Sequence, residues 1–426
     1  MLHAPPVAAP PAGKPDHALP GAARGAQPGG GRDLRLDVFR GLAMFIILIA
    51  HTPDNIWTLW IPARFGWSDA TEIFVFCSGM ASAIAFGRVF ERRGLAMGTA
   101  RVGFRLWQVY WAHVGLFVAL AATLAWLDNT GWFAKDYIAT LNLHPFFRDP
   151  QMNLPAFLTL HYVPNYFDIL PMYLVALAMM PAIVALHRVH GALALAAVLA
   201  MWAAAQFGLF AFGAEPWSER RWFFNPFGWQ LIFFTGFAFM AGWLPRPPVR
   251  PALVWLAALV VIATVIPAYH WGRLLPDIPA AEMTGFQQAR LWLHETTEPM
   301  RAAIAPLIFK SNFGLLRYVH FLALAYLAWV LAGDRGRRLL PRGDGRAARI
   351  WGAVLAAIMK VGQQSLAIFI FSMWYAQVQG VFLDQLGRSG WAYALVNVTG
   401  LLMLVAIAYG AGWFKSQPWK TRRSPG

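Results

Sequence analysis

Residues 37–57, DVFRGLAMFIILIAHTPDNIW, decide the fold of this 426-residue chain. Every side chain between Leu42 and Ala50 is apolar, and the stretch has the length of about 20 residues that a helix needs to cross a bilayer. Apolar stretches of similar length recur along the chain. The sequence therefore predicts an all-α polytopic integral membrane protein with about ten transmembrane helices, at 37–57, 69–87, 102–127, 168–187, 191–212, 227–244, 251–270, 313–333, 363–383 and 391–414.

The composition agrees with a membrane protein and excludes a soluble one. Hydrophobic residues make up 58% of the chain and charged residues only 13%, whereas a soluble protein needs more charge to cover its surface. The net charge of +15 is what basic cytoplasmic loops produce, and without a soluble basic domain we expect no nucleic-acid partner. A single cysteine, Cys77, excludes an intrachain disulfide and a multi-cysteine metal site, and we expect no bound metal.

The chain divides into one large membrane domain and two tails. Residues 1–31 are rich in Pro, Gly and Ala and predict a disordered cytoplasmic tail. Residues 32–414 form a single transmembrane domain, and 415–426 form a basic cytoplasmic tail. Two long loops, 128–167 and 271–312, contain Pro, Trp, Tyr and His, which favours folded lids over loose linkers. Residues 347–361 are amphipathic and are expected to lie at the membrane interface.

The distribution of basic residues predicts that both termini are cytoplasmic. If the N-terminus is inside, the inner segments hold 24 of the 35 Lys and Arg residues and only six acidic residues. The inside then carries a net charge of +18 and the outside −3. This asymmetry is the one that the positive-inside rule describes.

The first span carries Arg40 and His51 on one face. Eleven positions make three helical turns plus about 20°, so the two side chains lie about 16 Å apart along the axis. Asp37 lies one turn below Arg40 and can pair with it. Arg40 can also be read as an interfacial anchor, and His51 as a hydrogen-bonded structural histidine. Their common face favours a polar track through the membrane.

The second span opens with Asp69 and Glu72, one turn apart and level with His51. A carboxylate at this position can hold the imidazole in one tautomer and stabilise its charged form. Alternatively, both acids are ordinary helix N-terminal residues, stabilised by the positive end of the helix dipole. That alternative accounts for Asp69 better than for the deeper Glu72.

Further polar residues lie at both ends of the other spans. Arg101 and Arg105 are one turn apart at the cytoplasmic face and, with Arg40, form a cationic cluster suited to phosphates, although alone they fit the positive-inside rule. Asp168 begins the fourth span and is a modest N-cap. The outer start of the eighth span carries Lys310, Arg317 and His320.

Several segments resemble known acyltransferases. The Arg40-to-His51 spacing resembles the first motif of the membrane acyltransferase 3 family, GWSDATEIFVFCSGM its second and RVGFRLWQVYWAH its third. A closer resemblance is to the OpgC family, succinyltransferases of osmoregulated periplasmic glucans. It rests on RLDVFRGLAMFIILIAHTPDN, FGWSDATEIFVFCSG, DILPMY, FNPFGWQ and GQQSLAIF, which spread over residues 32–380.

The resemblance implies transfer of a succinyl group from cytoplasmic succinyl-CoA to hydroxyls of a periplasmic glucan. It implies a bacterial inner-membrane protein whose partners are the glucan, acyl-CoA and the lipid bilayer, with acyl-CoA as a co-substrate and no tightly bound cofactor. The free carboxylate of the succinyl group needs a positive partner outside, for which Arg64, Lys310 and Arg317 are candidates. The implied site residues are His51 as general base with Glu72 or Asp69 orienting it, Arg40, Asp37, Arg101, Arg105 and Ser78 for CoA, and Asp168, Asp54, Asn55, Lys310 and Arg317 for the glucan.

Two alternatives stay open. One is an acyltransferase that uses acetyl-CoA or another acyl donor, or that modifies a different envelope glycan or lipid. The other is a polytopic transporter without chemistry, for which inverted repeats and broken midplane helices would be diagnostic. No clear repeat relates the two halves of the sequence.

Overall fold

The computed structural model describes residues 33–273 and 275–420, and within them all the regular structure is helical. The only strand-like pairing in this part is an isolated bridge between Gly213 and Arg221. The predicted tail 1–31 and the last six residues lie outside the described residues. The α-helices are α1 (Arg35–His51), α2 (Ala70–Ser82), α3 (Arg88–Asn129), α4 (His144–Arg148), α5 (Pro150–Leu158), α6 (Ile169–Val189), α7 (Gly191–Gln206), α8 (Pro226–Ala241), α9 (Pro251–Ala263), α10 (Val265–Ala268), α11 (Gly285–Ala303), α12 (Ala305–Ile308), α13 (Leu315–Ala332), α14 (Arg346–Gln363), α15 (Ser365–Leu386) and α16 (Gly390–Ser416).

Six helical segments of the described chain are long and apolar enough to cross a membrane. The all-helical membrane fold is therefore confirmed, whereas the count of ten spans and the orientation stay predictions. The difference in number arises from helices of 16 or 17 residues (α1, α7 and α8) and from α2 and α3, which join into one 60-residue segment. The six segments are Ala70–Asn129, Ile169–Val189, Pro251–Ala268, Leu315–Ala332, Ser365–Leu386 and Gly390–Ser416.

The joined segment from α2 to α3 is not a straight helix. A π-helical turn, Ala83–Gly87, links the two helices, and Gly94 has φ 79° and ψ 178° within α3. Glycine takes such a conformation without a Cβ clash, so the chain can break its helical path there. The predicted spans 69–87 and 102–127 therefore fall on either side of a real break.

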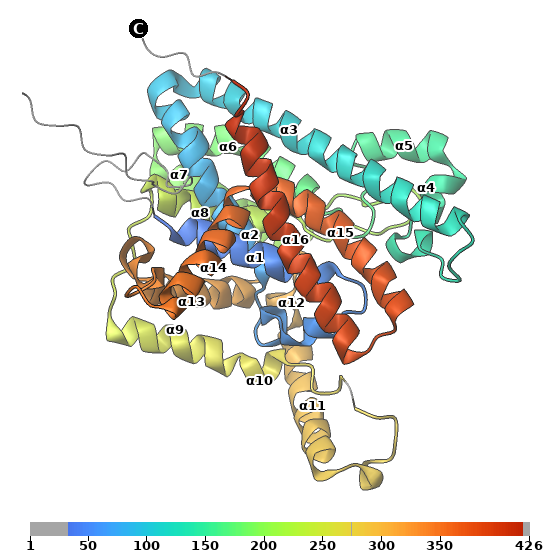
Figure 1. Cartoon of the computed structure of the whole chain (residues 1–426). Helices are drawn as coiled ribbons and strands as arrows, with labels where there is room; N and C mark the ends of the chain where they lie inside the picture. The colour runs from blue at the N-terminus through green and yellow to red at the C-terminus, as the bar shows by residue number, and fades with distance from the viewer. Residues whose placement is uncertain (1–32, 274, 421–426) are drawn as a thin grey trace, which may run out of the picture. The chain divides into compact units, whose positions relative to one another are not determined.

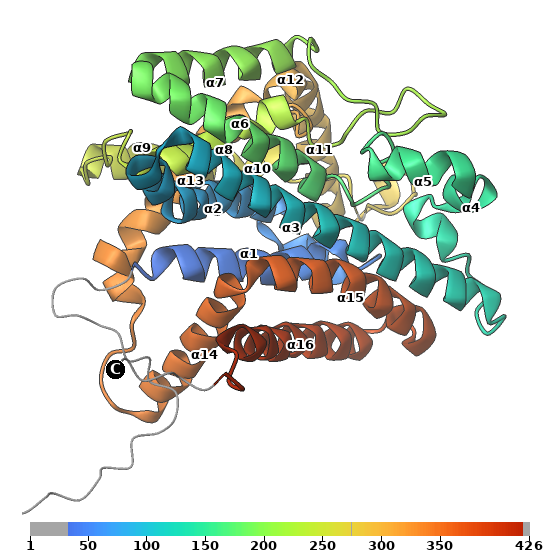
Figure 2. The same cartoon turned by 90° about the horizontal axis from the view of Figure 1, so that it is seen from above.

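Helix α1 lies at the centre of the bundle. Figure 2 shows α1 between a group that contains α2, α3 and α8 and a second group formed by α14, α15 and α16, and its packing partners are α2, α14, α15 and α16. Glycines allow the closest approaches: a Cβ at Gly362 of α14 would lie 1.9 Å from the carbonyl oxygen of Asp37, and one at Gly79 of α2 would lie 1.9 Å from that of Phe233. Small residues at such crossings let helix backbones meet in a membrane. The Asp37 end of α1 is thus held against α14, and α2 is held against α8.

The outward faces of several helices are apolar. Trp255, Leu259 and Ile262 of α9 are 63–74% exposed, and Leu402 of α16 is 64% exposed. Surfaces of this kind suit lipid and not water. In Figure 2 both α9 and α16 lie at the edge of the helical bundle, and α9 also lies at the edge in Figure 1.

The two long loops contain folded elements, as the sequence predicts. Residues 128–167 contain the turn Ile138–Leu141 followed by α4 and α5, and residues 271–312 contain α11 and α12. The amphipathic stretch at 347–361 lies within α14, which packs on α1 and α16. Whether the loops act as lids stays a prediction.

Candidate active site

His51 is the last residue of α1, and its ring is held by its own helix. Its Nδ1 lies 2.8 Å from the carbonyl oxygen of Ile47, one turn earlier. Because a carbonyl oxygen can only accept, Nδ1 carries the proton in the neutral ring and Nε2 keeps a lone pair. This geometry leaves Nε2 able to accept a proton.

Tyr166 packs its ring edgewise against His51, with the ring centroids 5.4 Å apart. Tyr166 has φ 70°, which is uncommon for a residue with a bulky side chain. Conformations of this kind cluster at functional sites, where the surrounding structure enforces them. The sequence analysis missed Tyr166, because nothing local in the sequence reports a positive φ at a tyrosine.

Asp69 and Glu72 form the capping box that begins α2. The Asp69 carboxylate accepts from Thr71 N at 2.7 Å, and Glu72 Oε2 accepts from Asp69 N at 2.7 Å. These bonds satisfy backbone donors that the first turn of a helix leaves open. The helix-terminus interpretation thus holds for both acids, and it does not exclude a second role.

The same two carboxylates form ion pairs with the segment before α13 and with its first turn. Lys310 Nζ lies 2.5 Å from Asp69 Oδ2, and Arg317 Nε lies 2.8 Å from Glu72 Oε1. Glu72 is fully buried, and Asp69 and Arg317 are nearly so. We call Asp69, Glu72, Lys310 and Arg317 the ion cluster. Each basic side chain of the cluster thus contacts an acidic one, as buried charged groups require.

The electrostatics of the ion cluster keep Asp69 ionised. Burial alone would raise the pKa of Asp69, but Lys310 and Arg317 outweigh it and hold this pKa well below its usual range. Lys310 and Asp69 also act electrostatically on the His51 ring. No hydrogen bond joins His51 to Asp69 or Glu72 in the described structure; the Ile47 carbonyl holds Nδ1, where the sequence predicted a carboxylate.

Ser68 and His320 adjoin the ion cluster. Ser68 Oγ lies 2.7 Å from His320 Nδ1, and both residues are buried. A Cβ at Gly66 would lie 2.5 Å from the His320 ring, so the chain before α2 runs directly over this imidazole. The sequence places His320 on a polar face, and the structure places that face against the start of α2.

Lys310 also lies near two aromatic rings, one of which is anchored by Asp168. The Lys310 ammonium is 6.0 and 5.7 Å from the ring centres of Phe223 and Phe224. Asp168 accepts from Phe223 N at 2.8 Å and so fixes this aromatic pair. Burial raises the pKa of Asp168 to about 6, although the Phe223 N–H and Arg220 oppose the shift. The sequence analysis named neither ring as a site residue, although Phe224 is the first residue of the FNPFGWQ segment that carries the family resemblance.

Asp54 and Asn55 follow His51 but differ in environment. Asn55 is buried and exchanges side-chain amide bonds with Asn397 of α16 at 2.7 and 3.0 Å. Asp54 is exposed, with φ 51°, and its carboxylate lies 3.5 Å from Arg388. Asn55 therefore ties α1 to α16, whereas Asp54 can still meet a substrate.

The other end of α1 meets the junction of α14 and α15. Arg40 donates to Ser365 Oγ, and Gln363 Nε2 donates to Asp37 Oδ2 at 3.2 Å. Both partners belong to the GQQS sequence at 362–365. The segments that carry the family resemblance are thus in contact although they lie more than 300 residues apart.

The remaining residues predicted to bind CoA are Arg101, Arg105 and Ser78. The contacts of the two arginines are with residues of their own helix. Arg101 is exposed beside the Phe104 ring, and Arg105 donates to Gln108 at 3.2 Å, both within α3. Ser78 is buried in α2. Among residues 33–273 and 275–420, no group of three or more His, Cys, Asp or Glu side chains is arranged to hold a metal ion.

A comparison with protein families decides the assignment. A family model described as OpgC protein matches residues 32–416. The chain belongs to the OpgC family. Membership indicates an acyltransferase of glucan modification, and the membrane-span-like helices agree with a membrane protein. No curated protein and no solved structure matches the chain. The OpgC match includes both ends of α1 and the whole ion cluster.

Proposed function

We propose that this OpgC protein is a bacterial inner-membrane O-acyltransferase that moves a succinyl group from cytoplasmic succinyl-CoA to a hydroxyl of a periplasmic glucan, with His51 as general base. The observation that carries the proposal is the Nδ1 bond of His51 to the Ile47 carbonyl, which leaves Nε2 as the basic atom. The family supplies the reaction class.

In the proposed reaction, His51 Nε2 takes the proton of the glucan hydroxyl as the oxygen attacks the thioester carbon. The C–S bond then breaks, and the proton passes from the imidazolium to the leaving sulfur, giving a glucan ester and free CoA. A sugar hydroxyl is a weak nucleophile near neutral pH, so removing its proton during attack is the step that needs catalysis. No covalent acyl-enzyme is required.

The proposal assigns the two ends of α1 to the two substrates. Arg40 lies at the opposite end from His51, eleven residues or about 16 Å away along the helix, beside Ser365. A guanidinium there suits the phosphates of CoA, whose flexible arm would carry the thioester toward His51. The exposed Asp54 and the Phe223–Phe224 pair beside Lys310 suit the acceptor, because sugar rings stack on aromatic faces.

The proposal is tested by mass spectrometry of periplasmic glucans from cells that produce the wild-type protein, His51→Ala or His161→Ala. His161 is an exposed histidine bonded only to Thr159, so it is a matched control. We expect succinylated glucan with wild type and His161→Ala, and a loss of about 10²–10⁴-fold in rate with His51→Ala at equal protein level.

Full succinylation by His51→Ala would remove the general-base role. An acetyl-sized mass increment would keep the mechanism and change the donor. Glucans that are identical with and without the wild-type protein would show that periplasmic glucan is not the acceptor and would favour the alternative that the protein is a transporter.

A further inference from the structure

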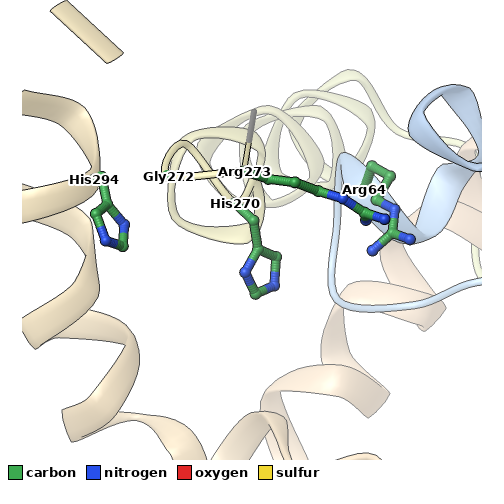
Figure 3. Close-up of a pocket in the computed structure, with 5 residues that line it drawn as sticks. All are labelled: Arg64, His270, Gly272, Arg273 and His294. Atoms are coloured by element: carbon green, nitrogen blue, oxygen red, sulfur yellow. The ribbon is translucent and has the colours of Figure 1, made fainter. Parts of the chain in front are cut away.

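A second polar site lies outside the ion cluster. A cavity of about 350 Å³ is lined by the segment before α2, the turn that follows α10, and α11. Figure 3 shows the Arg273 side chain extended toward Arg64, with the His270 ring below Arg273 and the His294 ring on the side away from Arg64. We call it the arginine pocket; its lining residues are Arg64, His270, Gly272, Arg273 and His294.

The two arginines of this pocket lack a carboxylate partner. Within the described part of the chain, neither Arg64 nor Arg273 has an acidic group at salt-bridge distance. Arg64 donates its Nε to Thr58 O at 3.0 Å, which anchors the side chain. Two guanidinium groups repel each other unless an anion lies between them, and guanidinium forks bind planar oxyanions in two-point geometry.

Further positive charge surrounds the pocket, and one carboxylate lies near it. Arg301 is 3.1 Å from His270 Nδ1, and Glu298 pairs with Arg301 at 3.2 Å and lies 3.9 Å from His294 Nδ1. Burial, then Arg273, lowers the pKa of Arg64. Burial, then Arg301 and Arg64, lowers the pKa of His270. Glu298 is thus engaged by Arg301, and no described salt bridge places a carboxylate on Arg64 or Arg273.

The arginine pocket lies within a bounded distance of the ion cluster. Arg64 is five residues before Asp69, so their Cα atoms are at most about 18 Å apart. Phe65 packs on Tyr269 with ring centroids 5.9 Å apart, which holds the two walls of the pocket together. In the ion cluster, by contrast, Lys310 and Arg317 already contact Asp69 and Glu72. A free carboxylate therefore finds unpaired positive charge in the arginine pocket and not in the ion cluster.

We infer that the arginine pocket binds the free carboxylate of a succinyl group on the outer side of the membrane, through Arg64 and Arg273. The inference rests on the proposed function for its choice of ligand. The carboxylate can come from the donor's succinyl group during transfer or from succinyl groups already on the glucan. In both cases the recognised chemistry is an anionic carboxylate on a short ester-linked chain.

The test measures binding of monomethyl succinate to the purified full-length protein in detergent by calorimetry, with uncharged dimethyl succinate as the comparison ligand. We expect binding to wild type that weakens at least tenfold in Arg64→Gln and in Arg273→Gln. Arg148→Gln, at an exposed arginine that ends α4, should bind like wild type. Equal binding of the uncharged diester, unchanged binding in both pocket variants, or no binding to wild type would overturn the inference.

Kinetics with two acceptors then distinguish the sources. If the donor's carboxylate occupies the pocket, Arg273→Gln raises the KM for succinyl-CoA with unsubstituted glucan. If instead a succinyl carboxylate on the glucan acceptor occupies the pocket, Arg273→Gln raises the KM only for glucan that is already succinylated. An unchanged KM in both arms would overturn the inference. Failure of wild type to transfer succinate at all would reject the proposed function and leave the measured carboxylate binding in place.

Discussion

At the scale of single residues, the pKa values of two buried carboxylates are shifted in opposite directions: that of Asp69 is lowered and that of Asp168 is raised. Asp69 faces Lys310 and Arg317, which keep it charged. Asp168 is 4% exposed; the backbone N–H groups of Phe223 and of Asp168 itself, together with the charge of Arg220, favour its ionised form. Burial nevertheless dominates at Asp168 and raises its pKa to about 6.

The raised pKa of Asp168 makes stability depend on pH. Its ordinary value is 3.8, so between about pH 4 and 6 the folded protein holds a proton that the unfolded chain has lost. This group therefore adds stability as the pH falls through 6 and loses that contribution above it. From pH 7.5 to pH 5 the gain amounts to about 1 kcal/mol.

Thermal unfolding in detergent at the two pH values checks this, with Asp168→Asn as the reference. Asparagine keeps an oxygen acceptor for Phe223 N but does not titrate. We expect wild type to gain stability relative to Asp168→Asn on going from pH 7.5 to pH 5. A constant difference between the two proteins would show that Asp168 titrates normally.

At the scale of secondary-structure elements, the crossing of α1 and α14 positions the polar inner end of α1. The crossing depends on Gly41 and Gly362: a Cβ at either would lie 2.1 or 1.9 Å from a backbone carbonyl oxygen of the other helix. Arg40 and its partner Ser365 lie next to these contacts. Separation of the two helices would thus disturb the proposed CoA end first.

We expect Gly362→Ala to destabilise the protein by about 1–3 kcal/mol, because a methyl group inserted there must push the helices apart. Gly410→Ala on α16 is the control, since a Cβ at Gly410 meets nothing within 4 Å. That control should be neutral or slightly stabilising, as alanine favours a helix over glycine. Thermal unfolding of both variants gives the comparison; equal melting temperatures would mean that α14 does not pack on α1 as described.

At the scale of the whole molecule, the sequence predicts those features that depend on residues close together in the chain, such as the helices and their polar faces. The apolar runs predict the helices, and the helical period places Arg40 and His51 on one face of α1. The pairing of Asp69 with Lys310 joins residues 241 positions apart, and only the packed fold can bring these together. The hydrogen bond from His51 to Ile47 is local, but the sequence equally allowed a carboxylate in its place. The sequence named Arg64 as a candidate partner for the succinyl carboxylate, but its juxtaposition with Arg273 was beyond prediction for the same reason, since Phe65 and Tyr269 bring the two segments together.

Orientation in the membrane is the last prediction, and the proposed function depends on it. Because the predicted inner segments hold 24 of the 35 Lys and Arg residues, the positive-inside rule predicts that His51 faces the periplasm and Arg40 the cytoplasm. We expect a membrane-impermeant maleimide to label His161→Cys in intact cells with permeabilised outer membranes. Arg342→Cys should react only after lysis; both positions are exposed, and the native Cys77 is buried. Labelling of Arg342→Cys in intact cells would show that the protein has the opposite orientation, with its Arg40 end in the periplasm together with the glucan. A cytoplasmic acyl-CoA could then not bind at the Arg40 end as proposed.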